Sequence, residues 1–178
     1  VKTANFSWNA TLNFSKNKNE VLKLAEGVDE IDIESAFQSF GSYAIVGKPY
    51  GALYSDMWKR NDKGEMIVDA DGYPIVADER GFLGNPFPDW LANLRNTFTY
   101  KNLSLSFLFD IRQGGKIWCG TVARINQIGR TAITADREGT IVVPGVTESG
   151  AKNTVGMSKM DYYRYVIGDT GPGENAIY

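Results

Sequence analysis

The chain has 178 residues, of which 43% are hydrophobic and 12% aromatic, so it has enough apolar material for a folded core. Its formal net charge is −2, which argues against a nucleic-acid-binding protein, because such a protein needs a basic surface to neutralise phosphates. It contains no histidine and one cysteine, Cys119, which excludes a Ser-His-Asp triad, the commonest zinc ligand and an intrachain disulfide.

We predict neither a transmembrane helix nor a signal peptide in this sequence. No run of about 18 apolar residues is present, so no transmembrane helix is predicted. The chain begins at Val1 without a signal peptide, and apolar residues increase toward Tyr178. These ends are the ones we expect from a segment of a longer protein.

The first predicted strand covers residues 6–14. Its apolar and polar side chains alternate strictly, which is typical of a strand with one face turned away from water. The apolar face consists of Phe6, Trp8, Ala10, Leu12 and Phe14.

Residues 15–92 are expected to be a long connection that is rich in turn signals. Within it, residues 61–76 hold two similar units about eight residues apart, each a glycine-bearing turn followed by Ile-Val. We predict a β-hairpin over 61–78, in which Ile67-Val68 pairs with Ile75-Val76. Asp69-Ala70-Asp71-Gly72 is similar to the start of a calcium loop, but its glycine comes too early for an EF-hand, which favours a turn.

Two further alternating strands are predicted over 93–100 and 103–112, with only Lys101-Asn102 between them. So short a turn permits only an antiparallel hairpin, and we expect strand 6–14 on the other side of 93–100. The apolar face of 103–112 consists of Leu103, Leu105, Phe107, Phe109 and Ile111. Asp110 and Arg112 share the opposite face, either as a functional charged pair or as an ordinary cross-strand pair.

Residues 113–178 are expected to be a second long connection. Gly114-Gly115 is predicted to bend the chain as it leaves the strand, and Cys119 to be a small buried residue. Residues 116–129 predict a helix, 141–143 a short strand, and Ser158 the N-cap of a short helix over 161–166.

Short turns on one side and long connections on the other are typical of transmembrane β-barrels, whose strands have about 9–11 residues. Neither apolar face, in 6–14 or in 103–112, carries a charge. Trp8, Trp90 and Tyr100 lie where an aromatic girdle is expected. An ordinary half-buried antiparallel sheet remains the alternative from the pattern alone.

The sequence resembles the C-terminal part of the SusC/RagA family of TonB-dependent outer-membrane transporters. The matching segments, in order, are FSWNATLNFSKNKNEVLKL (6–24), GKPYGALYSDMW (47–58), NDKGEMIVDADGYPIV (61–76), LGNPFPDW (83–90), LSLSFLFDIRQGGKIWCGT (103–121) and MDYYRYV (160–166). The resemblance implies a mainly β fold: antiparallel up-and-down strands from part of a transmembrane β-barrel, with long extracellular loops and one or two short helices. It implies one fragment over 1–178 and a location in the cell outer membrane.

The resemblance also implies a function: import of glycans or oligopeptides by the full-length protein. The implied partners are a SusD-like surface lipoprotein, TonB and membrane lipid, with no nucleic acid. The plug and the TonB-contacting segment lie near the N-terminus of the family, outside this chain. Leu103 to Ile111 would then face lipid, and Asp110 and Arg112 the lumen or plug. A secreted β-rich module that binds glycans or surfaces is the alternative, and a hydrolase domain is a third hypothesis.

Aromatic side chains in the two long connections are the candidate contacts to a lid or substrate, namely Tyr54, Trp58, Tyr162 and Tyr163. The same rings could instead form small cores that order the connections. The loop carboxylates that could include a glycosidase pair are Asp56, Asp62, Glu65 and Asp89, and nothing marks two of them as buried. The sequence therefore predicts no catalytic residue, no metal site and no cofactor.

Overall fold

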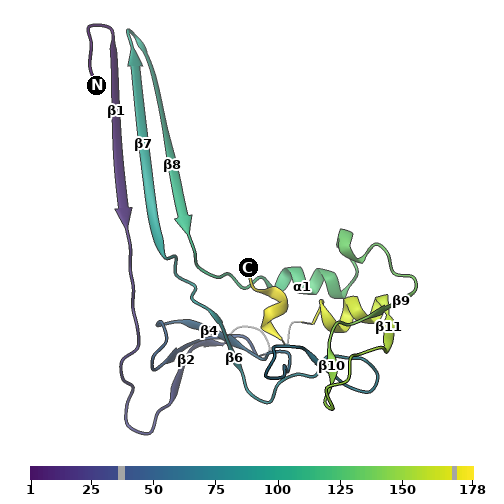
Figure 1. Ribbon diagram of the computed structural model, residues 1–178. Helices are drawn as coiled ribbons and strands as arrows, with labels where there is room; N and C mark the ends of the chain where they lie inside the picture. The colour runs from purple at the N-terminus through teal and green to yellow at the C-terminus, as the bar shows by residue number, and fades with distance from the viewer. Residues whose placement is uncertain (36–38, 170–171) are drawn as a thin grey trace. The chain divides into compact units, whose positions relative to one another are not determined.

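A computed structural model of the protein describes residues 1–35, 39–169 and 172–178. It divides into two compact units (Figure 1). The first, here called the strand unit, comprises residues 1–19 and 86–115. The second, the connection unit, comprises residues 20–85 and 116–178. The segments expected to be two long connections therefore form a compact unit of their own.

The strand unit is a three-stranded antiparallel sheet in the order β1-β7-β8. Its strands are β1 (Phe6–Ser15), β7 (Trp90–Tyr100) and β8 (Leu103–Gln113). The predicted pairing is confirmed, with strand 6–14 beside 93–100 and 93–100 beside 103–112. β7 begins three residues earlier than expected, because Trp90 to Ala92 continue the register opposite Gln113 to Ile111.

A two-residue turn joins β7 to β8. Tyr100 and Leu103 are directly opposite each other, so only Lys101 and Asn102 lie outside the ladder. Lys101 has φ of 53°, a left-handed conformation that suits the tight hairpins that connect right-handed twisted strands. Its backbone N–H donates to the carbonyl of Asn5 at 2.8 Å, which ties the turn to the start of β1.

A four-stranded antiparallel sheet is part of the connection unit, in the order β2-β3-β4-β6. Its strands are β2 (Glu30–Ser35), β3 (Gly41–Ile45), β4 (Ala52–Ser55) and β6 (Gly81–Gly84). This sheet lies within residues 15–92, which the sequence analysis treats as connection. The residues of β3 and β4 are buried or half-buried throughout, so these strands lack the alternation that reveals β1.

The predicted hairpin over 61–78 is confirmed as part of a small ribbon. Its two turns have the same structure: the side-chain oxygen of Asn61 accepts from the N–H groups of residues 63 and 65, and that of Asp69 accepts from those of residues 71 and 73. Gly64 and Gly72 have φ of 80° and 83°, which the turns require. Three backbone bonds join the arms, from Ile75 to Ile67, from Ile67 to Lys59 and from Lys59 to Ile75.

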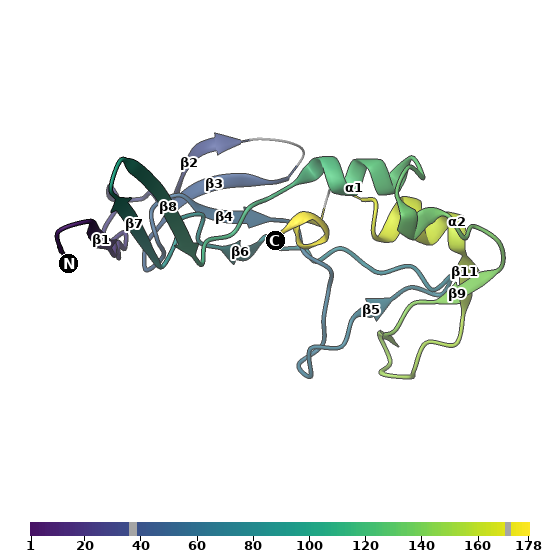
Figure 2. The same cartoon turned by 90° about the horizontal axis from the view of Figure 1, so that it is seen from above.

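Short helices and strands complete the connection unit (Figure 2). The elements are β5 (Ile67–Val68), α1 (Gly120–Gln127), η1 (Ala132–Thr134), β9 (Thr140–Val142), β10 (Val146–Thr147), β11 (Gly156–Ser158), α2 (Lys159–Asp161), the π-helical turn η2 (Tyr162–Val166) and η3 (Gly173–Ala176). The predicted cap is confirmed, since the Ser158 hydroxyl accepts from the N–H of Asp161 at 3.1 Å. In the described residues, no helix combines the length and the apolar character needed to span a membrane.

The core of the connection unit brings together residues from its two halves. Val68, Val143, Met157 and Val166 form a buried apolar cluster. Half-buried residues pack around it, including Met66, Tyr73, Ile141, Tyr162 and Ile167. Residues 116–178 are therefore held against the ribbon by burial of apolar surface.

Candidate functional site

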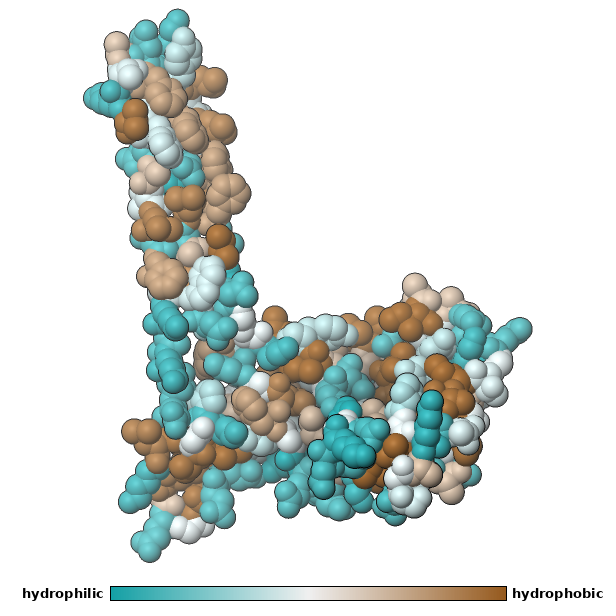
Figure 3. All heavy atoms as spheres, in the orientation of Figure 1, coloured by the Kyte–Doolittle hydropathy of each residue, from teal (hydrophilic) through white to brown (hydrophobic). Residues whose placement is uncertain are grey.

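One face of the strand unit is apolar across all three strands. The register places Trp8, Phe98 and Leu105 in one row, and Leu12, Leu94 and Phe109 in another. Several of these side chains are strongly exposed, with 68% of Leu12 and 61% of Leu105 accessible. Figure 3 shows apolar side chains along the length of this unit. An apolar surface that runs the full length of a sheet marks a site of contact with a membrane or another macromolecule.

The aromatic rings on this face contact one another. Trp8 stacks on Phe98 with ring centroids 5.8 Å apart and an interplanar angle of 2°. Phe107 lies 5.9 Å from Phe98 and 5.3 Å from Phe109. Such ring pairs add about 0.5–1.5 kcal/mol each beyond the burial of their area. The Trp8–Phe98 and Phe98–Phe107 ring pairs therefore link all three strands on this face.

The apolar face contains one buried polar side chain, Asn96, which is 6% exposed. Its side-chain oxygen accepts a hydrogen bond from the indole Nε1–H of Trp8 at 3.0 Å. An unpaired carboxamide on an apolar face costs free energy, and the indole N–H removes part of that cost. Trp8 therefore supplies a hydrogen-bond partner to the polar residue that is buried on this face.

The opposite face of the strand unit is mostly polar. Thr97 and Ser106 are hydrogen-bonded at 3.1 Å, and Thr99 and Ser104 at 3.2 Å. Asp110 lies on this face and accepts a hydrogen bond from the Asn93 carboxamide across the strands. Arg112 lies on the same face opposite Leu91. No ion pair joins Asp110 to Arg112 in the described residues, so Asp110 has a cross-strand polar partner rather than a charged one.

Gly114 and Gly115 end β8 with a bend, as predicted. Their φ values are 75° and 88°, which favour glycine strongly. A side chain at position 114 would collide with the Asp89 carboxylate, and the N–H of Asp89 donates to the Gln113 carbonyl at 2.8 Å. Cys119 is half-buried rather than buried, which corrects the sequence expectation.

The four candidate aromatic residues lie in different surroundings. Trp58 is only 5% exposed, and its indole N–H donates to Asn175 at 3.2 Å. Tyr54 is half-buried on β4, with Phe82 5.6 Å away. Tyr162 packs against the core cluster. Burial of its side chain is the main cause that raises the pKa of Tyr162 above the usual value of 10, and the neighbouring Tyr163 is the second cause. Tyr163 lines a surface pocket.

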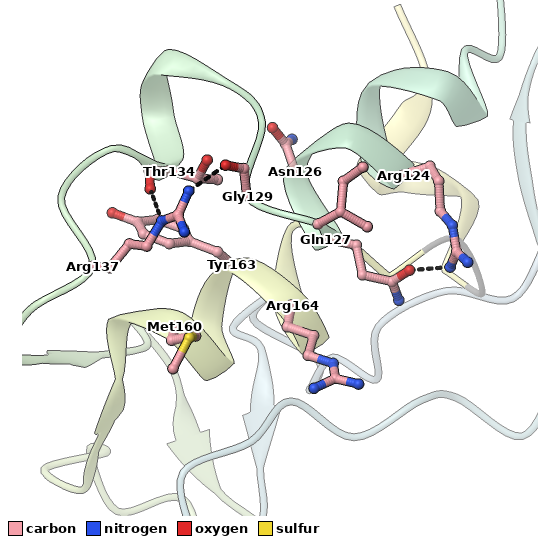
Figure 4. Close-up of a pocket in the computed structure, with 10 residues that line it drawn as sticks. Arg124, Asn126, Gln127, Gly129, Thr134, Arg137, Met160, Tyr163 and Arg164 are labelled. Atoms are coloured by element: carbon pink, nitrogen blue, oxygen red, sulfur yellow. Dashed lines mark hydrogen bonds between the residues drawn. The ribbon is translucent and has the colours of Figure 1, made fainter.

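This pocket has a volume of about 450 Å³ and lies in the connection unit (Figure 4). Three arginines from different segments line it: Arg124 from α1, Arg137 from the segment after η1, and Arg164 from η2. The remaining lining residues are Asn126, Gln127, Ile128, Gly129, Thr134, Met160 and Tyr163. Sequence reasoning missed this grouping, although α1 lies within the predicted helix.

The carboxylates considered in the sequence lie mostly at the surface of the part of the chain that the structure describes. No set of three or more His, Cys, Asp or Glu residues in this part could hold a metal ion. Asp62, Glu65 and Asp89 are exposed, whereas Asp56 is half-buried. The side-chain oxygen of Asp69 accepts two backbone N–H groups, so it stabilises a turn.

Known proteins similar to this chain were found by sequence and by structure. A scan against models of protein families found no match. TonB-dependent receptor P26 of Formosa agariphila is 33% identical over 138 residues, which covers 66% of this chain and 14% of the receptor. TonB-dependent receptor P3 of the same organism is 28% identical over 159 residues, which covers 76% of this chain and 16% of the receptor. The chain thus spans only 14–16% of the length of these curated relatives.

A solved structure has a similar fold. The structure of the RagAB peptide transporter matches with a TM-score of 0.52 and 18% sequence identity. The match covers 72% of this chain and 15% of that chain. At this identity the likeness concerns the fold: antiparallel strands with long, structured connections.

Proposed function

We propose, on the premise that the chain is a segment of a SusC/RagA-like TonB-dependent receptor of the outer membrane, that it forms part of the barrel wall and of the extracellular loops of a nutrient importer. In this proposal the strand unit belongs to the barrel, and the connection unit belongs to the loops. In this proposal the strand unit has a structural role in the membrane, and the connection unit takes part in recognition of the cargo or the lid.

The apolar face of the strand unit is the observation that carries this proposal. Five side chains of β8 alone, from Leu103 to Ile111, point to that face, and all are more than a third exposed. Complete burial of such a side chain is worth roughly 1.5–3 kcal/mol, and because these five are 38–72% exposed, about half of that gain remains available at each. A lipid bilayer supplies that burial, and the face carries no charge that the hydrocarbon would penalise.

The opposite face is proposed to line the lumen or to contact the plug. Asp110 and Arg112 both lie there, in a row of polar residues that suits an aqueous interior. Tyr54 and Tyr163, both half-buried, are proposed contacts to the lid or the cargo. Trp58 and Tyr162 belong to the same candidate set, and their packing suits them to holding the contact residues in place.

The cargo is proposed to be a glycan or an oligopeptide. A SusD-like surface lipoprotein closes the receptor from outside in this proposal, and TonB supplies the energy. Deleting the full-length gene and measuring growth on a panel of glycans and peptides tests the proposed transport. Normal growth of the deletion strain on every member of the panel would contradict it.

The membrane contact of β8 is tested by single cysteines in a cysteine-free full-length receptor in lipid vesicles. We expect fluorophores at 105, 107 and 109 to be quenched by a lipid-soluble nitroxide, and those at 104, 106 and 108 by aqueous iodide. The two sets are interleaved in one strand, so each is the matched control of the other. Quenching without a period of two would refute the proposed position in the barrel wall.

A further inference from the structure

We infer that the arginine-lined pocket of the connection unit binds an anionic group, a carboxylate or a sulfate, on a small solute. The pocket is lined by Arg124, Arg137 and Arg164, and its volume of about 450 Å³ is within the range of small-molecule sites. The inference rests on the proposed function only for the source of that solute, which is the imported cargo. Binding itself is measurable whether or not transport occurs.

The charge of the pocket is the first argument. Arginine stays protonated in proteins, so the three guanidinium groups are all cationic. No carboxylate is among the lining residues. The ion pairs in residues 1–35, 39–169 and 172–178 join Lys59 to Glu148, Arg60 to Glu174, Arg80 to Glu30 and Lys159 to Asp136, and none involves a pocket arginine.

Two acidic side chains close in sequence to the pocket arginines have other partners. Asp136 precedes Arg137 in the chain but pairs with Lys159. Asp161, three residues before Arg164, accepts a hydrogen bond from the Ser158 hydroxyl at 2.7 Å. Three arginines therefore line one pocket without a paired carboxylate in the described residues, and the resulting positive potential favours an anion.

The three arginines differ in how they are held. Arg137 Nε donates to the Thr134 carbonyl at 2.9 Å, and one of its terminal NH₂ groups donates to the Gly129 carbonyl (Figure 4). Gly129 has φ of 68°, which favours glycine, and a Cβ there would lie 2.8 Å from that NH₂ group and displace it. Arg137 is thus fixed as part of the pocket wall.

Arg124 and Arg164 keep more of their donors available. The only side-chain bond of Arg124 in the described residues goes to the Gln127 carboxamide. The guanidinium of Arg164 lies 5.1 Å from the centroid of the Tyr165 ring, and in the part of the chain that the structure describes it makes no ion pair. A planar fork of N–H donors matches the oxygens of carboxylate and sulfate. These two arginines are therefore the expected anion contacts.

The uncharged part of the pocket suits the body of an organic solute. Tyr163, Met160 and Ile128 contribute apolar surface, whereas Gln127 offers a carboxamide. A few polar groups beside an apolar wall are the usual composition of a small-molecule site. The pocket therefore fits a sugar acid or an acidic peptide end better than it fits a bare inorganic ion.

The test is a calorimetric titration of the purified full-length receptor at low ionic strength. The probes are sodium glucuronate, the dipeptide Ala-Glu, sodium sulfate and neutral glucose. We expect at least one of the organic anions to bind more tightly than glucose, with affinity that falls as salt is added. The first two probes separate a sugar source from a peptide source. Tightest binding by sulfate would assign the pocket to inorganic anions and overturn the fit to an organic solute.

The variants locate the site. The double variant Arg124→Gln/Arg164→Gln should weaken binding of the preferred anion about tenfold or more, because it removes two charge-assisted contacts. Arg130→Gln is the matched control, since Arg130 is an exposed neighbour outside the lining and should change affinity less than about twofold. Arg164→Lys keeps the positive charge but loses the planar pair of N–H donors, so its loss of affinity should lie between those of the double variant and Arg130→Gln.

Three results would overturn the inference: equal binding of glucose and the anions, equal loss in Arg130→Gln and in the double variant, or no anion binding at low salt. Circular dichroism of each variant separates lost binding from lost folding. The quenching pattern of β8 is an independent measurement, so failure here leaves the barrel-wall proposal standing, and the reverse also holds.

Discussion

Replacing Phe107 by arginine tests the membrane contact most directly, because the next residue provides its control. Phe107 lies near the middle of β8 and contacts Phe98 and Phe109. An arginine on the lipid side at mid-bilayer costs roughly 2–4 kcal/mol. Loss of two ring pairs adds about 0.5–1.5 kcal/mol each. We expect Phe107→Arg to lower the free energy of unfolding by about 3–7 kcal/mol.

Leu108→Arg places the same side chain on the opposite face of the same strand. The residue directly opposite position 108 is Arg95 on β7, and two like charges in opposite positions cost about 0.2–1 kcal/mol. Guanidinium titrations of the full-length receptor in phospholipid vesicles give both free energies of unfolding. A cost for Leu108→Arg equal to or greater than that for Phe107→Arg would refute the assignment of the two faces.

Three further changes test other parts of the structure. Trp8→Phe removes the indole donor to Asn96 and should lower the free energy of unfolding by about 1–3 kcal/mol in the same titration. Adding Asn96→Leu should restore most of that loss. An unchanged unfolding midpoint in Trp8→Phe would argue against the hydrogen bond. Asp69→Ala and Asn61→Ala should each lower the thermal unfolding midpoint, because each removes a side-chain acceptor from a turn. Adding calcium to the unmutated protein should leave the midpoint unchanged. A large rise with calcium would support a metal site in the turn. Because the pKa of Tyr162 is raised on folding, its contribution to stability should be complete below about pH 10 and be lost at higher pH. Tyr162→Phe should flatten that loss in melts recorded across this range, and an unaltered pH profile would contradict it.

The strand unit was predictable because one of its faces is apolar and the other is not. Because of that asymmetry, apolar and polar residues alternate along 6–14 and 103–112, and the short turn at 101–102 fixes the antiparallel pairing of β7 with β8. In β3 and β4 the signal is absent, since buried and half-buried residues fill these short strands. β2 did carry a signal, with Ile31 and Ile33 between acidic residues, and an alternation count would have found it.

The pocket was not predictable in the same way. Arg124 lies on a predicted helix, but Arg137 and Arg164 reach the pocket from an irregular segment and a π-helical turn. Their approach depends on contacts between distant parts of the chain, which no local periodicity encodes. The burial of Trp58 has the same origin, because its hydrogen-bond partners are Glu174 and Asn175 near the other end of the chain.

The contrast between the two connections in the strand unit sets an order of folding. β7 and β8 are joined by two residues, whereas β1 reaches β7 only across residues 16–89. For a flexible chain, closing the longer loop costs about 3 kcal/mol more than closing the shorter one. We therefore expect the β7–β8 hairpin to form before β1 pairs with it, since hairpins in general close in about 1–10 μs. β1 adds afterwards, and the sheet β2-β3-β4-β6 lowers the remaining entropy loss because it orders much of the intervening chain by itself.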